Sequence, residues 1–236
     1  MKHGIFVLTA AAFLSLSACK KAADEAAPAA EPAATASSAA TPAPEAAAPA
    51  TPAAAPAEPS AEDAERAQAQ AKLDFATMED GYLNDPKGQW ASAAKASTSY
   101  GSANGKDSTA KESYSPYQAT GPANDESWSN NSQSVGFDWI ELSYDKPVSA
   151  SEVRVALEGG NGAKGITKIE LIDAAGQAHT VWSGLSDSKR DERGGRTWIV
   201  RKFEPTAYQA KGVKLTFANN VENGYSYVDA VQLVGG

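Results

Sequence analysis

The sequence predicts an all-β sandwich of about eight strands, preceded by a signal peptide, a disordered Ala/Pro-rich linker and a short helix. Three observations support this prediction. Short runs with strand-like alternation begin near residue 90 and are separated by Gly, Asn and Pro clusters. Eight of the thirteen prolines lie between Pro28 and Pro59. An apolar run near the start ends at Cys19. We therefore divide the chain at residues 1–18, 19–60, 61–87 and 88–236.

The first eighteen residues have the layout of a secretory signal peptide. Lys2 supplies a positive charge, residues 5–16 are almost wholly apolar, and the small residues Ser17 and Ala18 follow. The apolar run is too short for a membrane-spanning helix, which needs about 20 such residues. Export of the chain is therefore expected.

The sequence Leu16-Ser17-Ala18-Cys19 resembles the lipobox of bacterial lipoproteins, and Cys19 is the only cysteine of the chain. The resemblance implies cleavage before Cys19, a diacylglycerol on its sulfur and an acylated amino group, which together would anchor the chain to a membrane. In a Gram-negative cell, Lys20 rather than Asp after the cysteine implies the outer membrane. The alternative is an ordinary signal peptide followed by a chance cysteine.

Residues 19–60 are dominated by Ala, Pro, Glu, Thr and Ser. Such a segment has too little apolar bulk to offset its ordering entropy, so we expect a disordered tether. Its prolines favour an extended chain. Ser60 can then cap a helix whose first turn contains Glu62 and Asp63, and Gly81 and Pro86 mark its end.

The remaining residues contain eight candidate strands separated by turn signals, which is the spacing of an all-β sandwich. The candidates are residues 91–100, 137–144, 152–158, 166–172, 178–183, 197–203, 212–217 and 225–234. Residues 173–176 are predicted to form a hairpin turn. The long polar stretch at 101–134 is predicted to be a functional loop, because loops of that length are uncommon in compact domains.

Several ordered motifs in residues 88–236 resemble one family. They are Ala-Ser-Thr-Ser-Tyr-Gly at 96–101, Tyr-Ser-Pro-Tyr-Gln-Ala-Thr-Gly-Pro at 114–122, Trp-Ile-Glu-Leu at 139–142, Glu-Val-Arg-Val at 152–155, Lys-Ile-Glu-Leu at 168–171 and Val-Asp-Ala-Val-Gln-Leu-Val-Gly at 228–235. The set is similar to galactose-binding-like, discoidin-type (F5/8 type C) domains. The resemblance implies a jelly-roll β-sandwich with binding loops at one end.

Composition argues against several functions. The net charge of −8 and its mixed signs disfavour nucleic acid, whose binders carry basic patches. The domain has no cysteine, and His179 is its only histidine. The sequence contains no Gly-x-Ser-x-Gly elbow that would activate a serine. We therefore expect a binding domain rather than an enzyme. A hydrolase acting on glycan through acidic residues such as Asp125 and Glu126 is a further alternative.

The candidate ligand-binding residues are aromatic and polar side chains near the long loop. Aromatic faces stack on the C–H surfaces of sugars, while polar groups bind the hydroxyls. The candidates are Tyr114, Tyr117, Asn124, Glu126, Trp128 and Tyr225. Trp128 is predicted to be the central platform because its neighbours in the sequence are polar. The alternative is that these rings fill the end of the core.

A structural calcium ion is the one cofactor that we consider, because discoidin-type relatives carry one with an acidic residue on the last strand. Asp229 occupies a similar place. The alternative for Asp229 is a buried, hydrogen-bonded carboxylate that holds the long loop.

We thus expect a membrane-anchored lipoprotein that displays a non-catalytic domain for envelope or extracellular glycan. The alternative is an assembly lipoprotein whose sandwich binds another envelope protein.

Overall fold

The computed structural model describes residues 60–100, 113–131 and 135–236. These residues form helix α1 (Ala61–Leu83), the short 3-10 helix η1 (Pro116–Ala119) and ten strands. The strands are β1 (Gly88–Trp90), β2 (Ala93–Ala96), β3 (Trp128–Ser129), β4 (Phe137–Val148), β5 (Ala150–Glu158), β6 (Ile166–Asp173), β7 (Ala178–Ser183), β8 (Arg196–Lys202), β9 (Ala210–Ala218) and β10 (Tyr227–Gly235). The predicted signal peptide, Cys19 and the tether lie outside the described residues. No helix of the described residues is long and apolar enough to cross a membrane.

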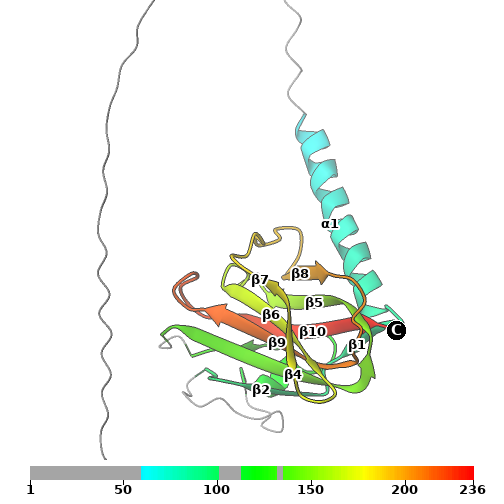
Figure 1. Ribbon diagram of the computed structural model, residues 1–236. Coiled ribbons are helices and arrows are strands. Elements are labelled where there is room, and N and C mark those ends of the chain that lie inside the picture. Colours follow the sequence, from blue (N-terminus) through cyan, green and yellow to red (C-terminus); the bar gives the residue numbers. More distant parts are fainter. Residues whose placement is uncertain (1–59, 101–112, 132–134) are drawn as a thin grey trace, which may run out of the picture. The chain divides into compact units, whose positions relative to one another are not determined.

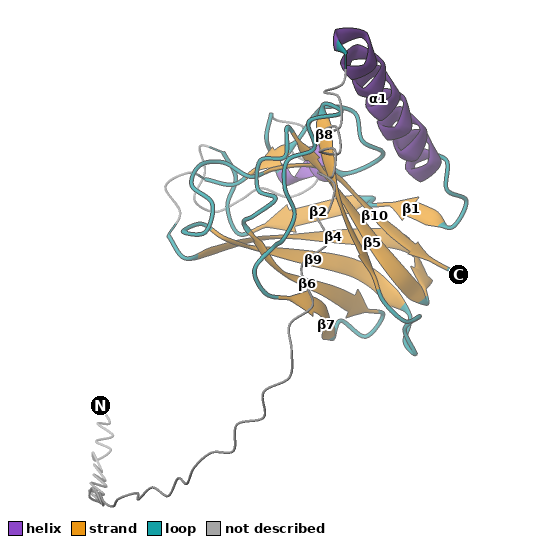
Figure 2. Cartoon of the chain, turned by 90° about the horizontal axis from the view of Figure 1, so that it is seen from above, coloured by secondary structure: helices purple, strands orange, loops and turns teal. Residues whose placement is uncertain are grey.

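The strands form two five-stranded sheets that pack face to face (Figures 1 and 2). The first sheet has the order β1-β10-β5-β8, with β3 also paired to β10, and the second has the order β2-β4-β9-β6-β7. All strand pairs are antiparallel. The chain passes between the sheets at most connections, so neighbouring strands in a sheet are distant in sequence. The predicted all-β sandwich is confirmed.

Alternating side chains from both sheets fill the core. On β4, the buried apolar residues are Ile140, Leu142 and Tyr144, two positions apart, as one inward-facing side of a strand requires. The Tyr144 hydroxyl donates to the carbonyl of Val231 at 3.2 Å, so this buried polar group is satisfied. Burial raises the pKa of Tyr144. Phe217 from β9 is among the other large buried side chains.

The predicted strand at residues 91–100 is shorter in the structure, where β2 covers only Ala93–Ala96, and the unpredicted strand β1 precedes it. The chain leaves the first sheet after Trp90 and enters the second at Ala93, so β1 pairs with β10 while β2 pairs with β4. Ala91 is buried at the crossing, where a larger side chain would be hard to place. Residues 88–96 therefore contribute to both sheets, first through β1 and then through β2.

Helix α1 begins as the sequence predicts and covers the outer face of the first sheet with its C-terminal half. The Ser60 hydroxyl accepts from the amide of Asp63 at 3.2 Å. Phe75 is its buried residue, and the Tyr82 ring meets the Trp198 ring at 5.2 Å. Because the helix covers this face, β5 and β10 are buried over most of their length on both sides. Figure 1 shows the N-terminal half of α1 extending beyond the sheets.

Candidate functional site

A pocket of about 170 Å³ opens at the end of the sandwich where β5 ends and β10 begins. Its lining residues come from the segment before η1, η1 itself, the loop before β3 and the end of β5. They are Ser113, Tyr114, Gln118, Asp125, Glu126, Ser127 and Glu158. The pocket therefore joins parts of the long predicted loop to the rigid end of a central strand.

Tyr114 is held in an unusual backbone conformation at the pocket wall. Its φ is +62°, and Asp125, on the same pocket, has a φ of +68°. These are the two non-glycine residues in the described part of the chain with positive φ. Such backbone strain persists only where surrounding contacts enforce it, and it is concentrated at functional sites. The Ser129 amide donates to the Tyr114 carbonyl at 3.2 Å, which is one of those contacts.

Four tyrosines form a cluster beside the pocket, which we call the tyrosine cluster. Its members are Tyr100, Tyr114, Tyr225 and Tyr227. Ring centroids lie 5.1 Å apart for Tyr100 and Tyr114, 5.3 Å for Tyr100 and Tyr225, and 5.8 Å for Tyr114 and Tyr227. Tyr100 is 51% exposed and Tyr114 is 37% exposed, so ring surface remains accessible to a ligand. Tyr114 belongs to both the pocket and the cluster.

A buried carboxylate holds the segments that carry the tyrosine cluster. Asp138 accepts from the hydroxyls of Ser97 and Thr98 and from the amide groups of Asn130 and Asn219 at 2.8–3.3 Å. These partners precede Tyr100, follow β3 and precede Tyr225 in the sequence, so one side chain organises three loop segments.

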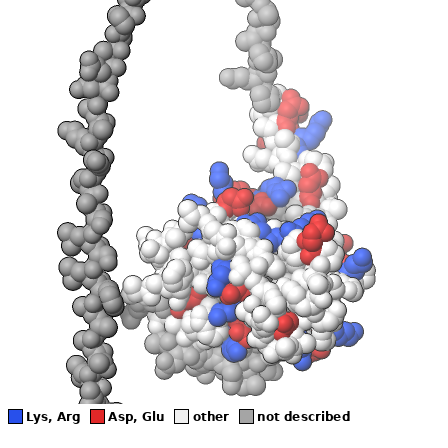
Figure 3. All heavy atoms as spheres, viewed as in Figure 1, with Lys and Arg blue, Asp and Glu red and all other residues white. Residues whose placement is uncertain are grey.

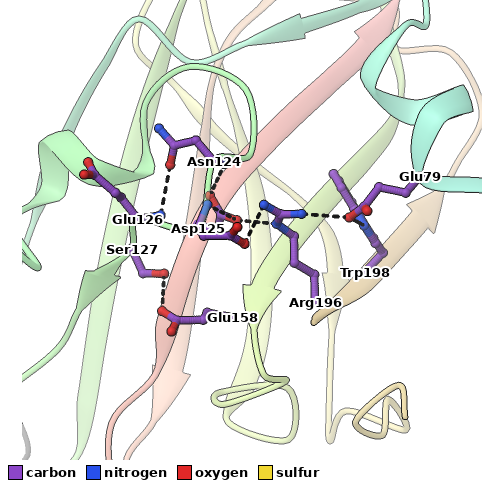
Figure 4. A network of polar contacts seen from close by, with 9 residues as sticks. Glu79, Asn124, Asp125, Glu126, Ser127, Glu158, Arg196 and Trp198 are labelled. Carbon is purple, nitrogen blue, oxygen red and sulfur yellow. Dashed lines mark hydrogen bonds and ion pairs between the residues drawn. The ribbon is translucent and has the colours of Figure 1, made fainter. Parts of the chain in front are cut away.

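Residues 123–126 carry one wall of the pocket, which Asp125 and Glu126 line, and they are fixed from behind by β10 (Figure 4). The Asp229 carboxylate accepts from the amides of Asn124 and Asp125 at 2.9 and 3.3 Å. The Asn124 side chain accepts from the amide of Glu126 at 3.0 Å and closes the turn. The Ser127 hydroxyl donates to Glu158 at 2.9 Å, which ties the wall to β5. Asp229 is thus a buried carboxylate that holds the loop before β3, as the alternative prediction for this residue states.

Arg196 lies between this wall and helix α1 (Figure 4). Its guanidinium contacts Glu79 at 3.2 Å, Asp125 at 2.6 Å and Asp229 at 2.6 Å. Burial disfavours its charged form, but the hydrogen bond and charge of Asp229, with the charges of Asp125 and Glu79, leave the pKa of Arg196 raised. The group therefore remains a cation that compensates three carboxylates only in part.

The pocket itself is acidic. Asp125, Glu126 and Glu158 line it, and among the described residues that line it none is Lys or Arg. Elsewhere the charges are mixed, and on the face seen in Figure 3 acidic and basic side chains lie next to one another. The carboxylates are acceptors for hydroxyl or ammonium donors.

The prediction that Trp128 is an exposed platform is wrong. Its side chain is fully buried, packs against Phe217 with centroids 5.7 Å apart, and donates from Nε1 to the Thr98 carbonyl at 3.0 Å. Its polar neighbours Ser127 and Ser129 are buried as well, and their hydroxyls donate to Glu158 and to the Asn130 carbonyl. Polar flanks therefore did not indicate exposure.

The other predicted residues are distributed around the site. Tyr114 and Glu126 line the pocket, Tyr225 belongs to the tyrosine cluster, and Asn124 shapes the wall from outside it. Tyr117 lies in η1 and is not among the pocket's lining residues.

Sequence analysis did not identify Tyr100, Tyr227 or Glu158 as ligand-binding residues, and it considered Asp125 only for the alternative hydrolase. The signal available for Tyr100 and Tyr227 was their place at the ends of predicted strands. For Glu158, the sequence offers no such signal.

The surroundings of Asp229 do not fit a calcium ion. Its carboxylate faces two amide donors and the Arg196 guanidinium, whereas calcium needs six to eight oxygen ligands. The described residues also contain no group of three or more His, Cys, Asp or Glu side chains arranged to hold a metal.

No protein-family profile and no curated protein matches the sequence. Similar solved structures include a chitosan-binding module of a Paenibacillus sp. IK-5 chitosanase/glucanase, with 16% identity, a TM-score of 0.44, and coverage of 60% of this chain and 93% of that chain. An F5/8 type C domain from Bacteroides fragilis has 14% identity, a TM-score of 0.44 and coverage of 62% and 96%. A Ruminococcus gnavus GH29 fucosidase has 12% identity and a TM-score of 0.42, and 66% of this chain spans 26% of that one.

Proposed function

We propose that the β-sandwich is a non-catalytic glycan-binding domain whose site is the pocket together with the tyrosine cluster. The observation that carries this proposal is the position of Tyr114. Its ring joins an exposed aromatic surface to a pocket lined by carboxylates and hydroxyls. A sugar presents an apolar face and a ring of hydroxyls, and it needs these two surfaces side by side.

Two of the three carboxylates of the pocket hold its shape. Asp125 is ion-paired with Arg196, and Glu158 accepts from Ser127. Such fixed acceptors suit recognition of hydroxyls, because a bound ligand replaces water without rearranging the wall. This supports binding rather than hydrolysis as the role of the acidic residues.

A glycan and peptidoglycan screen on the full-length protein tests the proposal, followed by calorimetry on the best ligand. Tyr114→Ala removes the ring shared by cluster and pocket, so its affinity should fall roughly thirtyfold, as for an anchor worth about 2 kcal/mol. Failure of every glycan to bind, or unchanged affinity in Tyr114→Ala, would overturn the proposal. Binding of an envelope protein instead would favour the assembly alternative.

Tyr208→Ala is a matched control. Tyr208 precedes β9 at the opposite end of the sandwich, where its ring stacks on His179 at 3.9 Å. This variant also loses a tyrosine ring, but its glycan affinity should equal that of the wild type.

The same proposal includes membrane anchoring through lipidated Cys19. It rests on the Leu16–Cys19 sequence, and an outer-membrane address rests on Lys20. Mass spectrometry of the membrane-extracted protein should find acyl chains on an N-terminal Cys19 peptide, and Cys19→Ser should release the protein from membranes. Recovery of an unmodified wild-type protein in the soluble fraction would contradict anchoring.

A further inference from the structure

Arg196 connects three segments that are far apart in the sequence. Its Nη1 contacts Glu79 of α1, its Nη2 contacts Asp125 of the pocket wall, and its Nε donates to Asp229 of β10. The Arg196 side chain is 15% exposed, and the Asp229 side chain is fully buried. Three carboxylates thus share one guanidinium, whose planar donors suit several acceptors at once.

Two of the carboxylates that contact Arg196 also accept hydrogen bonds from other groups. Glu79 also accepts from Trp198 Nε1 at 3.1 Å, which fixes its carboxylate on the outer face of β8. Asp229 accepts from the amides of Asn124 and Asp125. A continuous set of polar contacts therefore runs from α1 to the backbone of the pocket wall, as Figure 4 shows.

The position of Glu79 depends on how α1 docks. Phe75 is buried, and the Tyr82 carbonyl accepts from Gln232 Nε2 at 2.7 Å. Beyond the helix, Asp85 contacts Arg154 at 2.8 Å. Glu79 lies between these anchors, so docking of the helix places its carboxylate beside Arg196.

Within the pocket wall, Asp125 is the residue that both Arg196 and Asp229 hold. The Asp125 side chain is 79% exposed, and its backbone has positive φ, so Arg196 and Asp229 supply the contacts that hold it in place. If Arg196 lost its hold, Asp125 and the buried Asp229 would face each other without the cation between them, and like charges at close range repel.

We infer that helix α1 is a positioning element of the binding site, acting through Glu79 and Arg196 on residues 123–126. The inference rests on the proposed function in identifying those residues as a ligand-binding wall. Docking of α1 and order in the wall are then coupled, and the coupling is reciprocal, so a ligand in the pocket also strengthens docking of the helix.

Amide hydrogen exchange on the full-length protein tests the coupling without any ligand. Glu79→Ala removes the acceptor shared by Arg196 and Trp198. Exchange at the Asn124 and Asp125 amides should accelerate about fivefold or more, because about fivefold is the low end of the effect that coupled sites typically have on each other. Glu79→Gln retains a side-chain oxygen and should restore slow exchange in part. Unchanged exchange in Glu79→Ala would overturn the inference.

Glu65→Ala is the matched control. Glu65 is exposed on the N-terminal part of the same helix. Glu65→Ala therefore removes the same side chain and the same charge as Glu79→Ala. Exchange at Asn124 and Asp125 should stay at the wild-type rate. Acceleration equal to that in Glu79→Ala would mean a general effect of helix charge and would contradict the specific route.

Arg196→Lys gives a second test. A single ammonium cannot reproduce three directed contacts, so exchange at the wall should rise further than in Glu79→Ala. Where a glycan binds the wild type, Arg196→Lys should weaken its binding more than Glu79→Ala does. The melting temperature of Glu79→Ala should change little. Absence of any glycan ligand would refute the proposed function, whereas the exchange rates would still decide the coupling.

Discussion

At the scale of single residues, Trp128 has a structural role. It is fully buried, packs on Phe217 and donates to the Thr98 carbonyl. Trp128→Ala should lower the free energy of unfolding by about 3–5 kcal/mol, because it leaves a large cavity and an unpaired carbonyl. Trp128→Phe should recover part of this loss. Urea unfolding monitored by far-UV circular dichroism measures both values.

The control for this prediction is Phe137→Ala. The Phe137 side chain is 66% exposed, so its truncation should change the free energy of unfolding by about 0.5 kcal/mol or less. Equal destabilisation by Trp128→Ala and Phe137→Ala would show that the burial of Trp128 does not matter in solution.

At the scale of elements, docking of α1 depends on the contact between Phe75 and Gly194. A Cβ on Gly194 would overlap the Phe75 ring, so a glycine is needed there for the helix to approach. Phe75→Ala should destabilise the docked helix by roughly 3 kcal/mol, and Gly194→Ala should displace the ring. Hydrogen exchange in the last turns of α1 should accelerate in both variants.

Leu73→Ala serves as the comparison on the same helix. Its side chain is 60% exposed, so exchange in α1 should hardly change. Slow exchange in Phe75→Ala, as in the wild type, would contradict docking through Phe75.

The connector after α1 gives a pH dependence. The amide of Lys87 donates to Asp85, and together with Arg154 it holds the pKa of Asp85 below its ordinary value. A carboxyl whose native pKa is lowered stabilises the fold above its unfolded pKa of about 3.9, and this contribution disappears as pH falls through the native pKa. Wild type should therefore exceed Asp85→Asn in stability at pH 6, with the difference shrinking below about pH 4.

Urea unfolding of both proteins between pH 7 and pH 2.5 measures this difference. Asp173 and Asp191 also have lowered pKa values, but they are present in both proteins and cancel. A difference that is the same at pH 3 and pH 6 would refute the role of Asp85.

At the scale of the whole molecule, charge should decide which glycans bind. The pocket has three carboxylates and the chain has a net charge of −8, so uronate-bearing oligomers should bind more weakly than neutral or amine-bearing ones. Glu126→Gln should improve affinity for acidic oligomers about two- to fivefold at low salt and leave neutral ones unchanged. At about 1 M salt the gain should vanish, because screening then acts over about 3 Å.

Glu62→Gln is the charge-matched control, since Glu62 lies in the first turn of α1. It changes the net charge equally but should leave affinity for acidic oligomers unaltered. Acidic oligomers that bind as tightly as neutral ones to the wild type would show that the pocket carboxylates do not set specificity.

The sequence by itself determined most of the elements of this protein, but not β1, β3 or η1. Period-two alternation in residues 137–144 identified β4, and the limits predicted for residues 178–183 agree with β7. Ser60 identified the start of α1, and the turn before Gly176, which has a φ of +85°, joins β6 to β7. These features depend on residues close together in the chain, which is why a local pattern contains them.

Only the tertiary structure decided the site. Trp128 is buried because nearby residues bond to Glu158, Asn219 and Ser226, which lie far along the chain and which no local window reveals. Tyr100 and Tyr227 belong to one cluster because the rings of Tyr114 and Tyr225 each contact both of them. Arg196 reaches Asp125 because β8, β5 and β10 are adjacent in one sheet although distant in sequence. Strand pairing between distant segments sets these contacts, whereas alternation along one strand sets only which side chains turn inward.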